Sequence, residues 1–296
     1  MSSLNQPALS VVIVSYNCLG PLRDCLASFP AADYSPDFEI IVVDNNSEDG
    51  TPELVPKDYP EVRLVCNSTN RGFAAGCNQG ILVSEGKYVL LLNPDTVVRE
   101  RALRLTYEYM EHNPRVAAAS CRVLRPDGSL DPSCKRDFPT PWNAVCRVAG
   151  LSRLFPRSRV FARYDTGYLN ENTTQEVPLI DGCYMMIRRA AIDDIGLFDE
   201  QFFMYWEETD WCRRAHQRGW SIGYDPSGTI IHTKGETTRH YTFRMLYHFH
   251  RSFALYYRKH LGLWNPLFLM TYPLIWIRLA ALCGWNLMRR DRRVSG

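Results

Sequence analysis

The first hundred residues alternate short apolar runs with segments of helical periodicity. Four runs, in ALSVVIVSYN, FEIIVVDNNS, VRLVCNSTN and KYVLLLNPD, are rich in β-branched and aliphatic residues and predict strands. After the first run, Leu19, Leu22, Cys25, Leu26 and Phe29 recur at helical spacing, and GFAAGCNQGILVSEG predicts a helix before the fourth. Continuous apolar strands joined by helices predict an α/β fold whose mainly parallel sheet is covered on both faces.

Each predicted strand ends in a polar corner. In open sheets of this kind, ligands bind beyond the carboxyl ends of the strands, so the corners predict one shared crevice. A single acid there can also cap a helix or close a turn, as Asp44 before Ser47 and Asp49 could. No glycine-rich turn follows the first strand, so the dinucleotide fingerprint is absent, and there is no P-loop. The polar residues at the strand ends are Tyr16, Asn17, Asp44, Asn45, Asn46, Asn93 and Asp95.

Composition narrows the class of protein. With 46% hydrophobic and 22% charged residues among 296, the chain resembles an ordinary globular protein. Its 34 basic and 32 acidic residues give a net charge of +2, which argues against a nucleic-acid partner. The ten cysteines form no CxxC pair and no Cys/His cluster, so we expect reduced thiols. The N-terminus lacks the pattern of a signal peptide, and we expect the protein inside the cell.

The second half has a different pattern. VAAASCRVLRPDGSLD predicts a strand, a turn and a second edge, and VPLIDGCYMMIRRAAIDDIG predicts a strand and a helix. Between them, residues 138–176 form an irregular stretch rich in arginine and proline, a length typical of a mobile binding loop or lid.

Three acids stand together ahead of a predicted short helix, in YWEETDWCRR. They are Glu207, Glu208 and Asp210. Acids in the first turn stabilise a helix against its dipole, and Asp210 could also pair with Arg213 or Arg214. A carboxylate that can accept a proton is equally what an enzyme needs as a general base.

The last sixty residues are rich in aromatic and basic side chains. LWNPLFLMTYPLIWIRLAALCGWNLMRR is the most apolar stretch, but Pro266, Pro273 and Arg278 interrupt the run of about twenty apolar residues that a transmembrane helix needs. We therefore expect a helix lying in the membrane interface, held by aromatic residues and by arginines attracted to anionic lipid. A helix packed on its own domain, or on a second subunit in a homodimer, is the alternative. The residues concerned are Trp264, Tyr272, Trp276, Trp285, Arg289, Arg290, Arg292 and Arg293.

Seven segments, in order, resemble the pattern of glycosyltransferase family 2 on the GT-A fold. Within that family the chain is most similar to bacterial rhamnosyltransferases of cell-surface polysaccharide synthesis. The resemblance covers about residues 9–260, and seven ordered segments are far more specific than one motif. The segments are VVIVSYN, IIVVDNNSEDGT, NRGFAAGCNQG, LLNPDT, DGCYMMIRR, GLFDEQFFMYWEETDWCRRAHQRGW and IIHTKGET.

The resemblance implies a nucleotide-sugar site at the strand ends. Asp44 is expected to hold the base, with the SYN corner against the nucleoside and Asp181 at the entrance of the sugar site. A helix starting near Gly72 would aim free amides at the diphosphate, although ordinary helix packing also explains these glycines. The implied site consists of Ser15, Tyr16, Asn17, Asp44, Asn46, Arg71, Gly72, Asn78, Asn93, Asp95, Asp181 and Gly182.

The resemblance also implies a divalent metal. Asn93, Pro94 and Asp95 occupy the place of the DxD motif, whose last position binds a cation that bridges the donor diphosphate. Asparagine at the first position leaves one carboxylate, and His232 is implied as a further ligand, although a lone histidine after a strand is otherwise a turn residue. Mg²⁺ or Mn²⁺ would neutralise charge on the leaving phosphate. Because a single Asp supplies only one carboxylate ligand, the affinity for the metal without nucleotide should be poor.

For catalysis, the resemblance places Glu208 at the position of the general base of an inverting transferase. Glu207 precedes it and Asp210 follows it, and Glu207 is an alternative base. The family has aspartate at this position, and glutamate lengthens the arm by one methylene.

These expectations combine into one hypothesis. A GT-A type, Rossmann-like nucleotide-binding half (residues 1–118) precedes an acceptor-binding and catalytic half (119–238) and a helical tail (239–296). The expected reaction is metal-dependent, inverting transfer of a sugar, L-rhamnose from dTDP-rhamnose, to a lipid-linked or polysaccharide acceptor at the cytoplasmic face of the cell membrane. The alternatives are a UDP-sugar donor and an inactive nucleotide-sugar-binding protein. A sugar nucleotidyltransferase would need a glycine-rich, basic first loop, which SYNCLG lacks.

Overall fold

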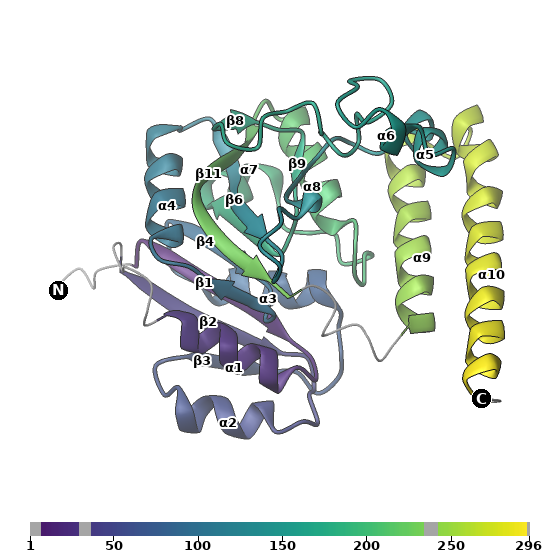
Figure 1. Ribbon diagram of the computed structural model, residues 1–296. Helices are drawn as coiled ribbons and strands as arrows, with labels where there is room; N and C mark the ends of the chain where they lie inside the picture. Colours follow the sequence, from purple (N-terminus) through teal and green to yellow (C-terminus); the bar gives the residue numbers. More distant parts are fainter. Residues whose placement is uncertain (1–6, 30–36, 234–241, 295–296) are drawn as a thin grey trace.

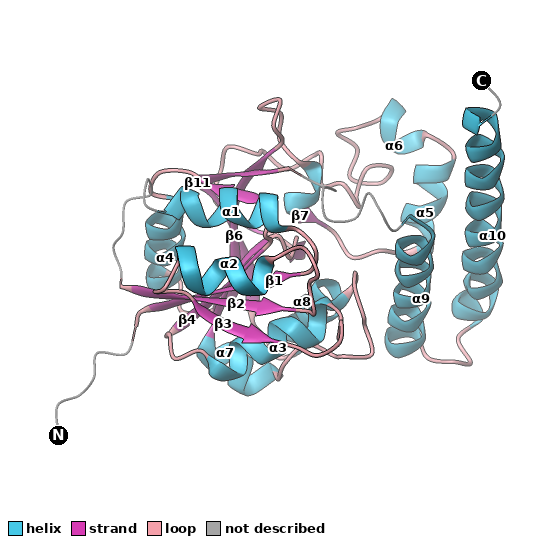
Figure 2. Cartoon of the chain, turned by 90° about the horizontal axis from the view of Figure 1, so that it is seen from below, coloured by secondary structure: helices cyan, strands magenta, loops and turns pink. Residues whose placement is uncertain are grey.

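A central sheet with helices on both faces forms the body of the protein, and two long helices stand beside it (Figure 1). The structure is a computed structural model that describes residues 7–29, 37–233 and 242–294. Figure 2 shows α1 and α2 on one face of the strands and α3, α7 and α8 on the other. All ten cysteines are free thiols, as expected.

The first four strands pair in parallel in the order β3-β2-β1-β4. Every residue of β1 and β4 is buried, as continuous apolar strands must be when helices cover both faces. The predicted alternation of four strands with three helices is confirmed. Its elements are β1 (Leu9–Ser15), α1 (Leu19–Ser28), β2 (Phe38–Asp44), α2 (Thr51–Asp58), β3 (Arg63–Cys66), α3 (Phe73–Val83) and β4 (Tyr88–Leu92).

The sheet continues without a break into the second half of the chain. Its full order is β3-β2-β1-β4-β10-β6-β11-β5, with β10 antiparallel to both of its neighbours and β6 parallel to β11. The α/β fold is thus confirmed, parallel through the nucleotide half and mixed beyond it. The boundary expected after residue 118 falls inside β6, and the one after residue 238 lies outside the described residues. The strands are β5 (Thr96–Val98), β6 (Val116–Leu124), β10 (Tyr184–Arg188) and β11 (Ser221–His232).

The stretch 138–176 contains two short helices, α5 and α6, where the sequence indicated only an irregular loop. Its mobility stays a prediction. The strands β7 and β9, which precede and follow this stretch in the sequence, pair as a two-stranded antiparallel sheet. The remaining elements are α4 (Ala102–His112), η2 (Pro132–Cys134), β7 (Lys135–Arg136), α5 (Pro141–Val148), α6 (Leu151–Leu154), β8 (Gln175–Glu176), β9 (Leu179–Ile180), α7 (Arg189–Ile195) and α8 (Glu207–Gln217).

The tail forms two helices that lie side by side, α9 (Thr242–Leu261) and α10 (Pro266–Val294) (Figures 1 and 2). Pro266 is the first residue of α10, where a missing N–H is harmless, and Pro273 is accommodated inside the helix. By length and composition, Pro266–Trp285 could cross a membrane, and 11% of its most apolar window is buried. The expectation that Pro266, Pro273 and Arg278 leave too short an apolar run for a membrane-spanning helix is therefore wrong, whereas a helix lying in the membrane interface stays a prediction. The clustered Arg289, Arg290, Arg292 and Arg293 lie outside the residues whose side chains are described.

Two glycines let helix α3 lie directly on strand β1. A Cβ placed on Gly80 would lie 2.2 Å from Cγ1 of Val12, and one on Gly76 would lie 2.8 Å from Cγ1 of Val14. Real Cβ atoms do not approach this closely, so the helix can reach the strand only where both side chains are absent. These glycines therefore set how closely α3 packs against strand β1.

Gly80→Ala should destabilise the protein. The added methyl group forces α3 and β1 apart, and overpacking of this kind costs about 1–3 kcal/mol. Urea unfolding measures the change. Gly20→Ala in α1, where nothing lies within 4 Å of the new Cβ, is the matched control and should unfold at the wild-type midpoint or slightly above it. Equal midpoints for the two variants would contradict the packing argument.

Candidate active site

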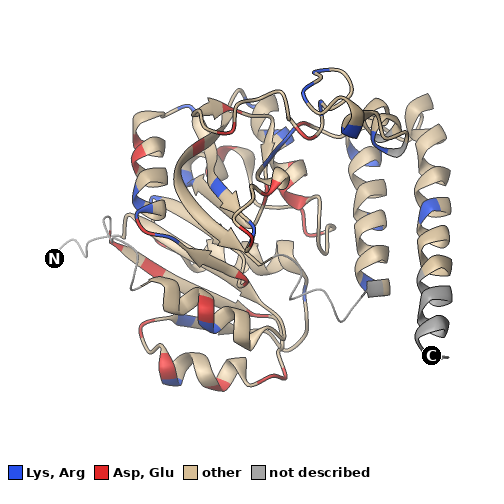
Figure 3. Ribbon diagram, viewed as in Figure 1, with Lys and Arg blue, Asp and Glu red and all other residues tan. Residues whose placement is uncertain are grey.

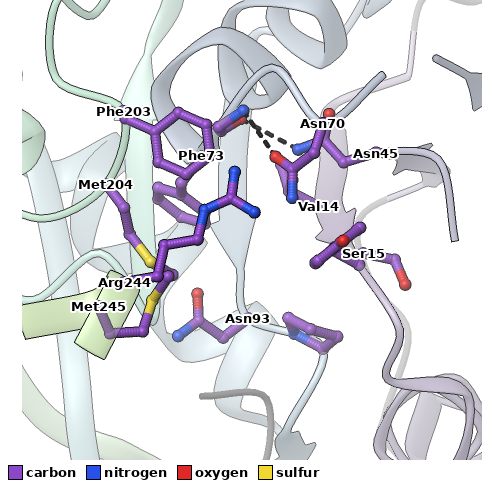
Figure 4. Close-up of a pocket in the computed structure, with 13 residues that line it drawn as sticks. Val14, Ser15, Asn45, Asn70, Phe73, Asn93, Phe203, Met204, Arg244 and Met245 are labelled. Carbon is purple, nitrogen blue, oxygen red and sulfur yellow. Dashed lines mark hydrogen bonds between the residues drawn. The ribbon is translucent and has the colours of Figure 1, made fainter. Parts of the chain in front are cut away.

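A cavity opens at the carboxyl ends of β1, β2 and β4, where the strand-end pattern predicted a crevice (Figure 4). Three of its lining residues are polar and come from the ends of β1, β2 and β4: Ser15, Asn45 and Asn93. The side chains of Ser15 and Asn45 are buried and bonded within the protein, to Sγ of Cys18 at 3.2 Å and to the carbonyl of Gly72 at 3.0 Å. Tyr16, Gly72 and Pro94 were also expected here, whereas the aromatic and methionine wall was not. The complete lining is Val14, Ser15, Tyr16, Asn45, Asn70, Gly72, Phe73, Asn93, Pro94, Phe203, Met204, Arg244 and Met245.

Asp44 ends β2 and is only 1% exposed. Its Oδ2 accepts a hydrogen bond of 2.9 Å from the amide of Ser47, which closes the turn that the sequence suggested. Its Oδ1 is buried and has no hydrogen-bond partner among the described residues. A buried carboxylate oxygen is normally satisfied, so this oxygen is an exception that the fold itself does not explain. Asp44 does not line the cavity, and its role as a base-binding residue stays a prediction.

Asn17 and Asn46 shape the loops around this acid. Both have left-handed backbone conformations, with φ of 48° and 67°. Oδ1 of Asn17 accepts from the amide of Glu48 at 2.8 Å, and the amide of Asn17 donates to Oγ of Ser47 at 2.9 Å. Neither asparagine lines the cavity, so the structure places both in support of the strand ends.

Gly72 precedes α3 with φ of +89°, a conformation that favours glycine. A Cβ there would lie 2.3 Å from the carbonyl oxygen of Phe203, and that oxygen accepts a 2.7 Å hydrogen bond from the amide of Phe73. The helix starts near Gly72 as predicted. However, the amide of its first residue holds the Phe203 segment, so it is not free for a diphosphate in this structure.

Asn78 and Arg71 hold the same segment. Asn78 donates from Nδ2 to the carbonyl of Phe198 at 2.9 Å and accepts from its amide at 3.0 Å. Arg71 lies 3.6 Å from the carboxylate of Glu200, and both side chains are about half exposed. These two predicted donor-site residues lie outside the cavity, where they fix the loop that carries Phe203.

Asp95 and His232 are brought together, as predicted. Asp95 follows β4, His232 ends β11, and Oδ1 of Asp95 lies 3.1 Å from Nε2 of His232. Nδ2 of Asn93 lies 3.4 Å from the same nitrogen. The carboxylate and the imidazole are 3% and 5% exposed, so both are nearly enclosed.

Whether this pair fits a divalent metal can be judged from its donor atoms. One carboxylate and one imidazole suit Mn²⁺ or Mg²⁺, which fill their other positions with water and phosphate oxygens. No cluster of three His, Cys, Asp or Glu side chains that could hold a metal occurs in the described part of the chain. Asp95 and His232 therefore fit a cation that arrives with a phosphate ligand, not one held by the protein alone.

The acids Glu207 and Glu208 begin α8 directly after a strained turn. Tyr205 and Trp206 both have left-handed backbones, with φ of 66° and 74°. For bulky residues this costs on the order of 1–3 kcal/mol each, and such strain clusters at functional sites. Both acids are nearly buried, at 5% and 8% exposure.

Gly182 connects these acids to the cavity. A Cβ on Gly182 would lie 3.7 Å from the ring of Phe73, which lines the cavity, and 3.8 Å from Cβ of Glu208. Asp181 lies close enough for its charge to raise the pKa of both glutamates, and its Oδ1 accepts from the amide of Cys183. The predicted Asp181, Gly182, Glu207 and Glu208 thus form one group beside the cavity.

Arg136 separates the roles of the two glutamates. Its Nη2 donates to Oε1 of Glu208 at 3.0 Å, and its Nη1 donates to the hydroxyl of Tyr164 at 3.3 Å. Burial raises the pKa of Glu208, but the charge of Arg136 opposes that shift. Burial and then the charge of Glu208 raise the pKa of Glu207 well above its usual value.

Glu208, which is paired with Arg136, therefore keeps its ionised form more readily than Glu207. Oε2 of Glu207 is buried and has no hydrogen-bond partner within the described residues. Sequence reasoning missed Arg136 because nothing in CKRDF distinguishes it from the arginines that follow; only the pairing of β7 with β9 brings it to Glu208.

Asp210 lies apart from this group, fully buried at the centre of an ion cluster whose basic partners are partly exposed. It contacts Arg214 at 2.9 Å, Lys259 at 2.9 Å and His260 at 2.8 Å. Burial alone would raise its pKa, but hydrogen bonds from His260 and Lys259 and the charge of Arg214 lower it to about 2. Arg214 is one of the two partners that the sequence suggested for Asp210; the other was Arg213. Since Lys259 and His260 belong to α9, Asp210 joins α8 to the C-terminal helices.

Comparison with known proteins gives concordant results. A family model described as "Glycosyl transferase family 2" matches residues 10–196. The N-acetylglucosaminyl-diphospho-decaprenol L-rhamnosyltransferase of Mycobacterium tuberculosis is 29% identical over 280 residues, which cover 90% of this chain and 88% of that protein. The low-salt glycan biosynthesis hexosyltransferase Agl10 of Haloferax volcanii is 26% identical, covering 76% of this chain and 67% of its own length.

A solved structure supports the fold assignment. The mannosyltransferase PcManGT from Pyrobaculum calidifontis, determined in complex with GDP-Man and Mn²⁺, matches with a TM-score of 0.59 at 20% identity. The match covers 99% of this chain and 81% of that one. The arrangement of sheet and helices is therefore that of GT-A glycosyltransferases.

Asp210→Asn should destabilise the protein at neutral pH. Because the folded pKa of about 2 lies below the usual value of 3.8, the ion cluster contributes stability above pH ~4 and loses it as the pH falls toward 2. The difference in free energy of unfolding between wild type and variant should be about 2 kcal/mol at pH 7 and shrink below pH 4. Urea unfolding at several pH values measures it, with the exposed Asp58→Asn as control. A difference that does not change with pH would contradict this role.

Proposed function

Because the chain belongs to glycosyl transferase family 2 and is a glycosyltransferase, we propose that it transfers L-rhamnose from dTDP-rhamnose to a lipid-linked glycan, with inversion at the anomeric carbon. The relative from M. tuberculosis, whose name gives both this sugar and a diphospho-decaprenol acceptor, supports this choice. The observation that carries the proposal is that residues of the cavity wall reach both groups: Asn93 lies 3.4 Å from His232 of the Asp95–His232 pair, and Gly182 lies between Phe73 and Glu208.

In this proposal the cavity binds the nucleoside diphosphate. The unpaired Oδ1 of Asp44 accepts an N–H of the base, and Ser15 and Tyr16 contact the nucleoside. Asn93 faces the diphosphate, while Asp181 and Gly182 border the sugar. The other predicted donor-site residues act indirectly by holding the surrounding loops: Asn17, Asn46, Arg71, Gly72 and Asn78.

Asp95 and His232 would hold the divalent cation, Mg²⁺ or Mn²⁺. When bound, it supplies neutralisation of the negative charge that collects on the departing diphosphate. The Mn²⁺ in the complex of PcManGT supports a divalent metal here.

Glu208 acts as the general base. Its carboxylate accepts the proton of the acceptor hydroxyl while that oxygen forms a bond to the anomeric carbon, and the bond from this carbon to the diphosphate oxygen breaks. Arg136 orients the carboxylate and favours its ionised form. Burial and the charge of Glu208 raise the pKa of the neighbouring Glu207, and Asp210 keeps α8 in place through α9.

The acceptor is proposed to be a lipid-linked glycan at the cytoplasmic face of the cell membrane. Helix α10 displays Met270, Leu274 and Ile277 at 68%, 61% and 63% exposure, an apolar surface that water does not favour. A membrane would cover it and would hold the enzyme near its substrate. A second copy of the chain is the alternative partner of this surface.

The test is transfer of labelled sugar from a panel of dTDP- and UDP-sugars, with Mn²⁺ or Mg²⁺ present, to a polyprenyl-diphosphate glycan. Wild type should use dTDP-rhamnose. Glu208→Gln should lower the transfer rate at least ~100-fold, since it cannot accept the proton, while binding the donor as wild type does. The wild-type rate should fall on the acid side at a midpoint above the usual carboxyl value of 4.5, because burial raises the pKa of Glu208.

Glu171→Gln, which changes an exposed carboxylate elsewhere, is the matched control and should retain the wild-type rate. Transfer by Glu208→Gln at the wild-type rate would show that Glu208 is not the general base. Preference for a UDP-sugar would correct the donor, and binding without transfer of any sugar would favour an inactive nucleotide-sugar-binding protein.

A further inference from the structure

Helix α9, which the sequence placed in a membrane-associating tail, forms one wall of the nucleotide cavity. Arg244 and Met245, from its first turn, line the cavity together with Phe203 and Met204. Figure 4 shows the side chain of Arg244 extending from the helix so that its guanidinium group points into the cavity.

Arg244 is the one charged residue among those that line the described cavity. Its guanidinium lies 5.5 Å from the ring centroid of Phe203, and within the described residues no carboxylate pairs with it. An arginine stacked on an aromatic face keeps its N–H groups directed outward in the plane of the guanidinium. These donors are therefore available to a ligand in the cavity.

We propose that Arg244 binds the diphosphate of the sugar donor, so that α9 completes the donor site. The other polar lining groups, Ser15, Tyr16, Asn45, Asn70 and Asn93, are neutral, and a nucleoside diphosphate carries at least two negative charges. Arginine binds phosphate oxygens through two parallel hydrogen bonds, an arrangement that a neutral side chain cannot match. The inference rests on the proposed function and adds to it a donor-binding residue outside the sheet.

The seating of α9 supports this role. His248 stacks on Phe203 with ring centroids 4.2 Å apart, and Oγ of Ser252 donates to the carbonyl of Met204 at 2.9 Å. Trp206 stacks on Phe253 at 4.5 Å. One face of α9 therefore holds the whole segment from Phe203 to the strained turn before Glu207, and the same helix carries Arg244 to the cavity.

The experiment compares Arg244→Ala with wild type by calorimetry, using thymidine 5′-diphosphate and uridine 5′-diphosphate, and then the two nucleosides alone. Loss of a charge-assisted bidentate contact should weaken diphosphate binding about 10- to 100-fold and leave nucleoside binding unchanged. Arg244→Lys should recover part of the loss, because lysine keeps the charge but not the paired donors. Arg258→Ala, an exposed arginine on the same helix, is the matched control and should bind as wild type.

Diphosphate binding by Arg244→Ala at the wild-type affinity would overturn the inference and leave the proposed function intact. A raised KM for the lipid-diphosphate acceptor, with unchanged nucleotide affinity, would also overturn it, since the anion would then belong to the acceptor. Wild-type protein that binds neither nucleotide would overturn the proposed function itself.

A different surface, the segment that contains α5 and α6, has a strongly basic and apolar character. Residues 138–164 contain five arginines and no acidic residue. Arg147 and Arg163 pair with Asp165 and Asp137, which lie just outside this range, so the exposed Arg153, Arg157 and Arg159 carry its net positive charge. Trp142, Leu154, Phe155 and Val160 are 49%, 70%, 51% and 55% exposed. The segment is nevertheless folded, because Nε1 of Trp142 donates to the carbonyl of Val160 at 3.2 Å and its aromatic rings are in contact.

We infer that this α5–α6 segment binds an anionic lipid surface. Exposed aromatic and aliphatic side chains beside arginines are the composition of elements that lie in a membrane interface, and the positive charge is complementary to anionic headgroups. The segment lies on the same side of the sheet as α9 and α10 (Figures 1 and 2), and Figure 3 shows Lys and Arg but hardly any acid along it. It also follows Arg136, which contacts Glu208, so a lipid-linked acceptor would arrive next to the proposed base.

Cosedimentation of the full chain with phosphatidylcholine vesicles, with and without phosphatidylglycerol, tests this surface. The triple change Arg153→Ser, Arg157→Ser and Arg159→Ser should weaken partition onto the anionic vesicles by about fivefold per arginine and leave nucleotide affinity unchanged. The same number of exposed arginines removed from the sheet body, by Arg23→Ser, Arg99→Ser and Arg125→Ser, should have little effect. Equal partition of both triple variants, or of wild type onto both kinds of vesicle, would overturn the inference.

Discussion

The contact between Asp95 and His232 is the constraint on which the site depends. It joins the end of β4, in the nucleotide half, to the end of β11, in the second half. Oδ1 of Asp95 lies 3.1 Å from Nε2 of His232, and both side chains are nearly buried. Asp95 directly precedes β5, which pairs with β11 so that Thr96 lies opposite His232, and the amide of Thr233 donates to the carbonyl of Asp95 at 2.9 Å. This local pairing at the edge of the sheet fixes the carboxylate and the imidazole relative to each other.

The C-terminal helices are part of the same construction. The turn at Tyr205 and Trp206 is strained, and α9 offsets that strain through aromatic stacking on Trp206 and the ion cluster at Asp210. The acids of α8, the Phe203 wall and Arg244 thus all depend on how α9 sits. An enzyme organised in this way couples the helices that carry its apolar surface to the geometry of its active site.

Much of this arrangement could be predicted from sequence. Short, continuous apolar runs that end in polar corners predict buried strands. The succession of elements from β1 to β4 and the crevice at the strand ends could therefore be predicted. Asp95 and His232 were expected as a pair because the family resemblance placed both in motifs.

Arg136 and Arg244 were not predicted, since each reaches the site only through a tertiary contact that no local sequence pattern indicates. The roles of Gly72 and Asn78 differ from expectation for the same reason: their partners, Phe203 and Phe198, lie more than a hundred residues away. Pro273 was expected to interrupt the apolar run, but the long, exposed helix α10 accommodates it.

The most direct test of the account is Mn²⁺ binding, measured by calorimetry without and with thymidine 5′-diphosphate. A site with one carboxylate and one imidazole should bind the ion weakly alone and at least about tenfold more tightly when the nucleotide supplies phosphate oxygens. Asp95→Ala should lose that gain while its circular dichroism spectrum stays that of wild type. The same gain in Asp95→Ala and in wild type would contradict the account, because the ion would then be held without the residue that joins the two halves.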